Sequence, residues 1–379
     1  MQKKIIALAV AGLVSGAAFA QSNVTIYGIA DIGYINQNAG SAGKGSGIVS
    51  GGLSTSRIGF RGTEDLGNGL SAIFQLEYNL YMDTNATIGG GGGITGGTSN
   101  GARTQILGLT SKNWGTVVGG FMNSPGMNAS VKYDPFGYSM FSPLRNLQDG
   151  ATVNGAQGVG VFNTHTINGN ARVQNAVAYV SPSFGGLTLT GAYVFGGISG
   201  DFANRDARDQ ERTWGLQAEY ANGPLSATFV YHDTNNIGNP LKAAASAEVD
   251  EWMIAASYDF GMAKVFGTYQ VSDFDTGVAG VRNEKDKAWQ LGVNVPVTAV
   301  GSVQFSYGRA SDDATGGNAD STSWGLQYQH AMSKRTTAYA GYSRVSNDRL
   351  TNLGNVMGAT NPDNGDNSRI WGAGLRHSF

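Results

Sequence analysis

Apolar and polar residues alternate with a period of two along most of the chain after residue 20. Since successive side chains of a β-strand point to opposite faces, each alternating segment predicts a strand with one apolar and one polar face. In the segment 211–220 the apolar positions are Trp214, Leu216, Ala218 and Tyr220. The same alternation begins again at Trp252, Trp289 and Trp324. Tryptophan and tyrosine favour a lipid–water interface, so this shared position predicts an aromatic girdle on a membrane protein.

The alternating segments number sixteen, and the connections between them are short and long in turn. The segments span residues 24–35, 56–64, 70–80, 103–111, 116–122, 171–180, 187–195, 211–220, 225–233, 250–260, 263–272, 286–295, 302–310, 321–330, 335–345 and 368–379. The short connections are built from turn-forming residues, and the long ones are rich in Gly, Asn, Asp and Ser. This combination predicts an all-β fold: a 16-stranded antiparallel transmembrane β-barrel with short periplasmic turns, long external loops and both termini on the periplasmic side.

A soluble β-sandwich is the alternative reading of the same alternation. It would have shorter strands and fewer aromatic residues at their ends. The chain has no long uninterrupted apolar stretch after residue 20, as expected of a barrel, in which only alternate residues face lipid. A closed barrel also satisfies every backbone hydrogen-bonding group within lipid. Sixteen strands enclose a lumen wider than side chains alone can fill, so the sequence favours a barrel with an aqueous channel.

The first twenty residues have the pattern of an export signal. Lys3 and Lys4 precede an apolar run over 5–14, and the segment ends in Ala18-Phe19-Ala20, which signal peptidase accepts. We therefore expect a signal peptide at 1–20 and one β-barrel domain at 21–379, located in the outer membrane. The 25 lysines and arginines do not exceed the 27 aspartates and glutamates, so no basic surplus indicates a nucleic-acid partner. The lack of cysteine excludes disulfides and thiolate metal sites.

Two segments and the last residue resemble a known family. The sequences VTIYGIADIGY at 24–34 and SRIGFRGTEDLGNGLSAIFQLE at 56–77 are similar to the first three strands of the trimeric general porins of β-proteobacteria, including the neisserial type. Phe379 matches the terminal aromatic residue that the barrel-assembly machinery reads in this family. The resemblance implies a homotrimer of pores for passive diffusion of ions and small hydrophilic solutes. The other partners then expected are outer-membrane lipid, lipopolysaccharide and the barrel-assembly machinery.

The resemblance also implies that the third long loop, about 123–170, folds into the barrel at mid-height. This loop is the longest in the chain, and its own apolar residues can pack against the lumen wall: Phe136, Tyr138, Phe141 and Leu144. Its segment DPFG at 134–137 is loosely similar to the acidic constriction motif of other porins. We therefore expect this loop to narrow the channel.

Two arginines lie on the polar face of the second predicted strand. Arg57 and Arg61 are four residues apart, so they share one face and point into the lumen, away from the apolar, lipid-facing side. In the resembling family, clustered arginines line the constriction of the pore. The simpler alternative is that both arginines pair with Glu64, Glu77 or neighbouring carboxylates inside the barrel.

Further candidates for the constriction lie on other strands and on the third loop. Arg103 and Arg172 begin two predicted strands and share polar faces with Gln105 and Gln174, so they are candidates for the same basic wall. The resembling family places acidic loop residues opposite such a wall. The candidates on the loop are two acidic residues, Asp134 and Asp149, and two basic ones, Lys132 and Arg145. A transverse field of this kind sets ion preference without tight binding, and the arginines predict a mild preference for anions.

An outer-membrane enzyme would need a histidine beside a nucleophile or a carboxylate. No short catalytic motif contains His165, His232, His330 or His377, and the sequence predicts no enzyme. No cofactor is predicted either. The aspartates of external loops offer hard oxygen ligands for Ca²⁺ or Mg²⁺, although solvated loop charge is the commoner role of such residues. They are Asp312, Asp313, Asp320, Asp363 and Asp366.

A substrate-specific outer-membrane channel is the alternative function. Such a channel would show a dedicated feature in its lumen, for example an aromatic slide for sugars or a lysine ladder for phosphate. The inward-facing positions of the predicted strands show neither run. An adhesin or a purely structural barrel would be narrower and would lack the long third loop.

Overall fold

The computed structural model of the chain describes residues 23–84, 88, 101–149, 172–195, 212–237, 247–275, 284–312, 320–349, 351–355 and 362–379. The segment 1–20, expected to be a signal peptide, lies outside these residues. The strands are β1 Asn23–Asn38, β2 Lys44–Ser50, β3 Arg57–Gly67, β4 Leu70–Asn79, β5 Ala102–Ser111, β6 Gly115–Asn123, β7 Arg172–Val180, β8 Leu187–Val194, β9 Arg212–Asn222, β10 Leu225–Ile237, β11 Ala247–Asp259, β12 Lys264–Asp275, β13 Glu284–Pro296, β14 Gly301–Asp312, β15 Asp320–Ala331, β16 Thr336–Asn347 and β17 Ser368–Ser378. The helices are η2 Gly40–Ala42, α2 Pro125–Tyr133 and α3 Pro143–Asp149. Within the described ranges, none of the helices is long and apolar enough to span a membrane.

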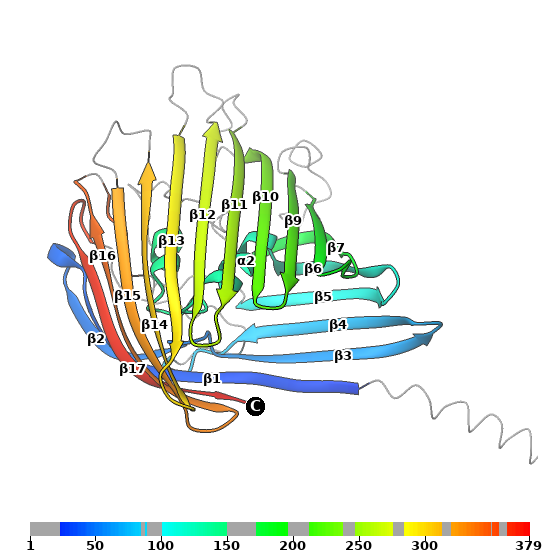
Figure 1. Cartoon of the computed structure of the whole chain (residues 1–379), viewed down its shortest axis with the longest axis horizontal. Coiled ribbons are helices and arrows are strands. Elements are labelled where there is room, and N and C mark those ends of the chain that lie inside the picture. The colour runs from blue at the N-terminus through cyan, green and yellow to red at the C-terminus, as the bar shows by residue number, and fades with distance from the viewer. Residues whose placement is uncertain are drawn as a thin grey trace, which may run out of the picture.

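The strands form one antiparallel sheet that closes on itself. From β3 onward each strand pairs with its neighbour in sequence, and β1 pairs with β17 to complete the ring. Figure 1 shows the strands as one continuous curved wall. On its other side β1 pairs with β2 through residues 32–38 and with β3 through residues 23–29. Because β2 and β3 share one place in the wall, the 17 described strands fill sixteen places, and the predicted antiparallel barrel is confirmed.

The position of β2 corrects the sequence analysis, in which these residues fall in the long connection between the predicted strands 24–35 and 56–64. Residues 44–50 pair with β1, and the connection from β1 is a short one that contains η2. The prediction was wrong because the sequence of β2, KGSGIVS, is rich in Gly and Ser and has few large apolar residues. The real interruption is the bend at 51–56, where the pairing with β1 is broken between β2 and β3.

The predicted aromatic girdle is present on the outward face. Trp214, Trp252, Trp289 and Trp324 lie in the first halves of β9, β11, β13 and β15, and Trp371 has the same place on β17. Each of these five rings lies 4.5–5.7 Å from a tyrosine ring of an adjacent strand. Below the girdle the outward face is apolar, as lipid contact requires. Alternating strand residues and a girdle at one height together mark the face that meets the bilayer.

The third connection lies inside the barrel, as the resemblance implied. Its described part, 124–149, carries α2 against β9–β12 and α3 against β13–β16 (Figure 1). The apolar side chains expected to anchor it are all buried: Phe136, Tyr138, Phe141 and Leu144. Phe136 and Phe141 pack with Tyr339 of β16 and Ile370 of β17. The hydrophobic effect therefore holds this segment on one side of the lumen.

Glycines on the inward face of the wall make room for the loop. An added Cβ at Gly341 would lie 2.5 Å from Cδ2 of Phe141, and one at Gly292 would lie 2.6 Å from Cγ of Pro135. Gly325 and Gly308 face the same loop in the same way. The loop can approach these strands closely because the wall has no side chains there.

Replacing Gly341 with alanine is expected to strain the docked loop. The three atoms nearest to the new Cβ all belong to the buried ring of Phe141, so the ring or the loop must move. Overpacking of this kind costs about 1–3 kcal/mol. We expect a lower midpoint for heat unfolding of the barrel on gels. Gly47→Ala is the matched control, since an added Cβ there meets nothing within 4 Å. Equal midpoints for the two variants would contradict the proposed packing.

Candidate functional site

Arg57 and Arg61 project into the lumen from β3, as predicted. Arg57 is the first residue of this strand and pairs with Ile29, near the middle of β1. Arg61 lies four residues further and pairs with Thr25. Gly59 between them faces the ring of Tyr27, which an added Cβ would overlap. The Arg61 guanidinium carbon lies 5.1 Å from the centre of this ring, so the tyrosine supports it by a cation–π contact.

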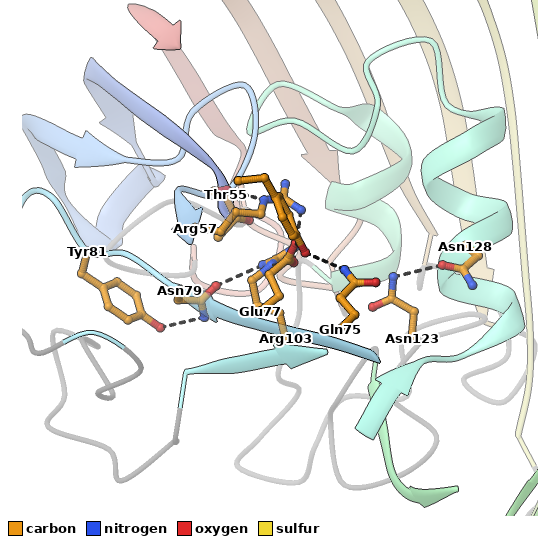
Figure 2. Close-up of polar contacts among 10 residues, drawn as sticks. Thr55, Arg57, Gln75, Glu77, Asn79, Tyr81, Arg103, Asn123 and Asn128 are labelled. Carbon is orange, nitrogen blue, oxygen red and sulfur yellow. Dashed lines mark hydrogen bonds and ion pairs between the residues drawn. The ribbon is translucent and has the colours of Figure 1, made fainter. Parts of the chain in front are cut away.

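Glu77 on β4 is the carboxylate around which two arginines gather (Figure 2). Its Oε1 atom lies 2.7 Å from Nε of Arg103 and 3.5 Å from Nη1 of Arg57. Its Oε2 atom accepts a hydrogen bond of 3.0 Å from the Tyr27 hydroxyl. Arg103 also donates through Nη1 to Oδ1 of Asn79, at 3.0 Å. The alternative that Arg57 pairs with Glu77 is thus confirmed, but one buried carboxylate is shared by two arginines.

Arg103 reaches this cluster by a different route from the one predicted. The sequence analysis placed Arg103 and Gln105 on the same inward face of a regular strand. The pairing of β4 with β5 shifts at this point, because Glu77 pairs with Thr104 and Tyr78 with Ala102. This bulge turns Arg103 inward, while Gln105 donates to the hydroxyl of outward-facing Tyr78 at 3.1 Å. Arg103 therefore faces inward, but the predicted face shared with Gln105 was wrong.

Arg172 and Arg376 add two more positive charges. Arg172 is the first residue of β7. The positive charges of Arg172 and Arg57 repel that of Arg103. Arg376 lies on β17 directly across from Asp31 of β1. Its electrostatic neighbours are Asp31 and Arg57. Sequence analysis missed Arg376, although the alternation of β17 places it on the inward face, opposite in parity to Trp371 and Leu375.

Asp31 fixes the bend from which Arg57 emerges. Its carboxylate accepts hydrogen bonds from the backbone N–H groups of Gly52, Leu53 and Ser54 at 3.1, 2.9 and 2.7 Å. The Tyr339 hydroxyl donates a further bond at 2.6 Å. This carboxylate is fully buried, so its charge serves the bend at 51–56 rather than the channel. The bend in turn accepts a hydrogen bond from the third loop, from Met140 N to Gly52 O at 2.9 Å.

Asp134 does not face the arginines. Its buried carboxylate accepts from the backbone N–H groups of Phe136 and Tyr138 at 3.2 and 2.7 Å, and from the side-chain amide of Gln290 at 3.1 Å. Burial raises the pKa of this carboxyl group, although the hydrogen bonds act in the opposite direction. Asp134 therefore ties the third loop to β13, which corrects its predicted place opposite the basic wall.

The other candidates on the loop also lie apart from the arginine cluster. Lys132 on α2 forms an ion pair of 2.6 Å with Glu219 of β9. Arg145 on α3 donates to the carbonyl oxygen of Tyr138 at 3.4 Å and lies over its ring. Asp149 is the last residue of α3, and its side chain is outside the part of the chain that the structure describes.

The remaining candidates occupy separate places in the fold. The Ser41 hydroxyl lies within hydrogen-bonding distance of the carboxylates of Asp363 and Asp366. The hydroxyl and the backbone N–H of Ser41 lower the pKa of Asp366. Arg309 pairs with Asp320, and Asp313 lies outside the described residues. Among the described residues, no group of three or more acidic or histidine side chains is arranged to hold a metal. His165 also lies outside them, and the other histidines belong to β10, β15 and β17.

Replacing Glu77 with glutamine should make the pore more positive and the barrel less stable. The variant leaves Arg57 and Arg103 close together without their shared counter-charge. Breaking a buried ion pair costs about 3 kcal/mol or more. We expect a lower heat-unfolding midpoint and a zero-current potential, measured across a salt gradient, that moves towards stronger anion preference. Glu64→Gln removes an exposed carboxylate from β3 and should change neither quantity. A potential that moves towards cations in the Glu77 variant would contradict this account.

Comparison with known proteins agrees with this architecture. The family model described as Gram-negative porin matches residues 7–350. The chain is 32% identical to outer membrane porin protein 32 of Delftia acidovorans over 384 residues, which cover 100% of both chains. It is 27% identical to an outer membrane porin protein of Bordetella pertussis, over 92% of this chain and 95% of that one. The structure is similar to the anion-selective porin from Comamonas acidovorans, with a TM-score of 0.78 and 29% identity over 95% of this chain and 100% of that one. The chain therefore belongs to the family of Gram-negative porins, the channel-forming β-barrels of the outer membrane.

Proposed function

We propose that this porin is a general diffusion channel for ions and small hydrophilic solutes with a mild preference for anions. The observation that supports this most strongly is the charge balance of the described lumen wall near mid-height. Arg57, Arg103, Arg172 and Arg376 interact electrostatically there, and Glu77 pairs with the first two of them. Arg61 adds a fifth positive charge further along β3, while the carboxylate of Asp31 is buried beneath a bend. An anion that passes this wall is attracted by more charges than repel it.

The third loop supplies little negative charge to oppose the wall. The sequence from 124 to 171 contains two carboxylates, Asp134 and Asp149. Asp134 is buried and occupied by hydrogen bonds to the loop and to β13. At most one loop carboxylate is then left to face the arginines, which supports the anion preference over a balanced field.

The net charge of the whole chain is negative and would by itself favour cations, but the charges of the lumen wall have the larger effect. The formal net charge is −2, but a charge in an external loop is screened within about 8–10 Å at physiological ionic strength. An ion in the constriction passes within a few ångströms of the arginines, where the attraction is far stronger. The similar protein from Comamonas acidovorans is named an anion-selective porin, which supports a preference for anions in the present chain too.

The assembly proposed for this chain is a homotrimer with a cleaved signal peptide at 1–20. A structure of OmpT, an outer membrane protein of Vibrio cholerae, is described as the trimer form, and this chain shares its fold, with a TM-score of 0.65 and 15% identity over 94% of this chain. Proposed partners are lipopolysaccharide, outer-membrane lipid and the barrel-assembly machinery. Phe379 supports the last of these, since its backbone continues the pairing with β1 through Gly28 and its ring lies against this glycine.

The relatives are channels rather than enzymes, and we extend this to the present chain. The competing function is a substrate-specific channel. The described lumen wall does not favour it, because the main feature of this wall is a cluster of arginines that can attract any small anion.

Conductance of single channels in planar bilayers tests the proposed function. A general diffusion pore should give a conductance that rises with salt concentration without saturating, and a trimer should insert in groups of three equal steps. Saturation at low millimolar solute, or blockade by one sugar or anion, would support the specific channel instead. Insertion in single steps, together with a monomer by light scattering in mild detergent, would contradict the proposed trimer.

A further inference from the structure

Two arginines lie side by side on the outward face of the barrel, near the external ends of β16 and β17. Arg344 and Arg369 are direct partners in the pairing of these strands. Both are exposed, and both share the outward parity of the aromatic residues Tyr342 and Trp371. Like charges directly opposite each other on one face of a sheet destabilise it, since their Cβ atoms are only about 5 Å apart. This arrangement favours an anion between the two guanidinium groups.

The protein itself does not supply that anion within its described residues. Neither Arg344 nor Arg369 has a hydrogen bond or an ion pair with another described side chain, which distinguishes them from Arg309. Arg309 faces outward from β14 at a similar height and pairs with Asp320. The two paired strands therefore present charge that is open to an external partner.

Aromatic neighbours place the two arginines at the level of the lipid head groups. Trp324 on β15 lies directly across from Arg344, and its ring is 5.0 Å from that of Tyr342. On the other side, the ring of Trp371 lies 5.6 Å from that of Tyr34 on β1. Since such rings mark the boundary between hydrocarbon and water, the guanidinium groups lie just on its watery side.

We propose that Arg344 and Arg369 form a binding site for a phosphate group of lipopolysaccharide in the outer leaflet. The planar guanidinium group of arginine binds phosphate through paired hydrogen bonds, and two such groups can hold one phosphate between them. The aromatic residues beneath contact the acyl chains of the same lipid. This inference rests on the proposed lipopolysaccharide partner and names the residues that bind it.

Binding of defined lipids to the purified protein tests the site. Wild-type protein, stripped of lipid in neutral detergent, is titrated with phosphorylated lipid A and with dephosphorylated lipid A. We expect the wild type to bind the phosphorylated form about tenfold more tightly or better, since one charge-assisted hydrogen bond accounts for a factor of this size. Arg344→Gln/Arg369→Gln should lose this preference, and Arg344→Lys/Arg369→Lys should keep part of it.

The matched control removes two charges at the opposite end of β16. Lys334→Gln/Arg335→Gln changes the exposed turn between β15 and β16 and should bind as the wild type does. Millimolar inorganic phosphate should compete poorly if the lipid contacts contribute to binding, and full competition would overturn the lipid part of the proposal. Unchanged discrimination by the Arg344/Arg369 double variant would overturn the site.

Two further measurements distinguish a lipid site from a contact between copies of the chain. Relief of like-charge repulsion should leave the heat-unfolding midpoint of Arg344→Gln/Arg369→Gln in neutral detergent equal to that of the wild type or higher. Dissociation of its oligomer in lipid-free detergent would assign the arginines to contact between copies and overturn the proposal. Channel conductance in lipid bilayers tests the pore itself, so a failed lipid site and a failed channel function give different results.

Discussion

Replacing Arg57 and Arg61 with glutamine is expected to shift the zero-current potential in a salt gradient strongly towards cations. Arg61 is exposed in the lumen, and Arg57 is the more distant of the two partners of Glu77, at 3.5 Å. The double variant keeps the 2.7 Å pair between Arg103 and Glu77, so the barrel should still fold. One charge at about 4 Å changes the energies of an anion and of a cation by about 1 kcal/mol each, in opposite directions, even in water. Since about 1.4 kcal/mol corresponds to a factor of ten, the loss of two charges should change the anion-to-cation permeability ratio by about tenfold or more.

The control for this experiment carries the same change of net charge on the outer surface. Arg344→Gln/Arg369→Gln removes two arginines from the outward face of the barrel, and its reversal potential should match that of the wild type. A reversal potential that is unchanged in the Arg57/Arg61 variant would show that these residues do not line the narrowest part of the pore.

Removal of the Asp134 carboxylate should release the third loop from the wall. Asp134→Ala leaves the buried backbone N–H groups of Phe136 and Tyr138 without their acceptor, and the amide of Gln290 keeps its bond to Ser306. A buried donor without a partner costs about 1–3 kcal/mol, so the loss of two such bonds should weaken the docking of the loop. We expect a larger and noisier single-channel conductance and a lower heat-unfolding midpoint.

Asp259→Ala is the matched control for the loop. Asp259 accepts one hydrogen bond, from Gly261 N at 2.8 Å, in the exposed turn between β11 and β12. This variant should conduct like the wild type. If Asp134→Ala also conducts like the wild type, the loop is held by its apolar contacts alone, and the role assigned to the carboxylate is wrong.

The sequence predicted the barrel well wherever its strands alternate regularly. From β9 to β17 the tryptophans and the apolar positions identify both the strands and their outward faces, because lipid contact imposes the same pattern on each. The sequence-based prediction missed β2, because its small residues show no alternation of apolar and polar positions. A short segment that pairs with a long first strand can form without a strong pattern of its own, since its partner supplies the register.

The candidate site could be predicted in part. Arg57 and Arg61 were identified because two like residues on one regular strand share a face. Arg103 faces inward only through a bulge, which depends on the pairing of β4 with β5 and has no simple pattern in sequence. Asp134 was assigned to the pore because motifs report residue types but not burial. Arg376 was missed because only the closure of the barrel brings the last strand beside the first.

The zero-current potential of the wild-type porin across a potassium chloride gradient tests the central claim most directly. The lumen wall that carries Arg57, Arg61, Arg103, Arg172 and Arg376 predicts a potential whose sign corresponds to faster passage of chloride than of potassium. The two ions have similar mobilities in water, so the sign reports the charge of the pore. A potential of the opposite sign, with potassium passing faster, would contradict the account.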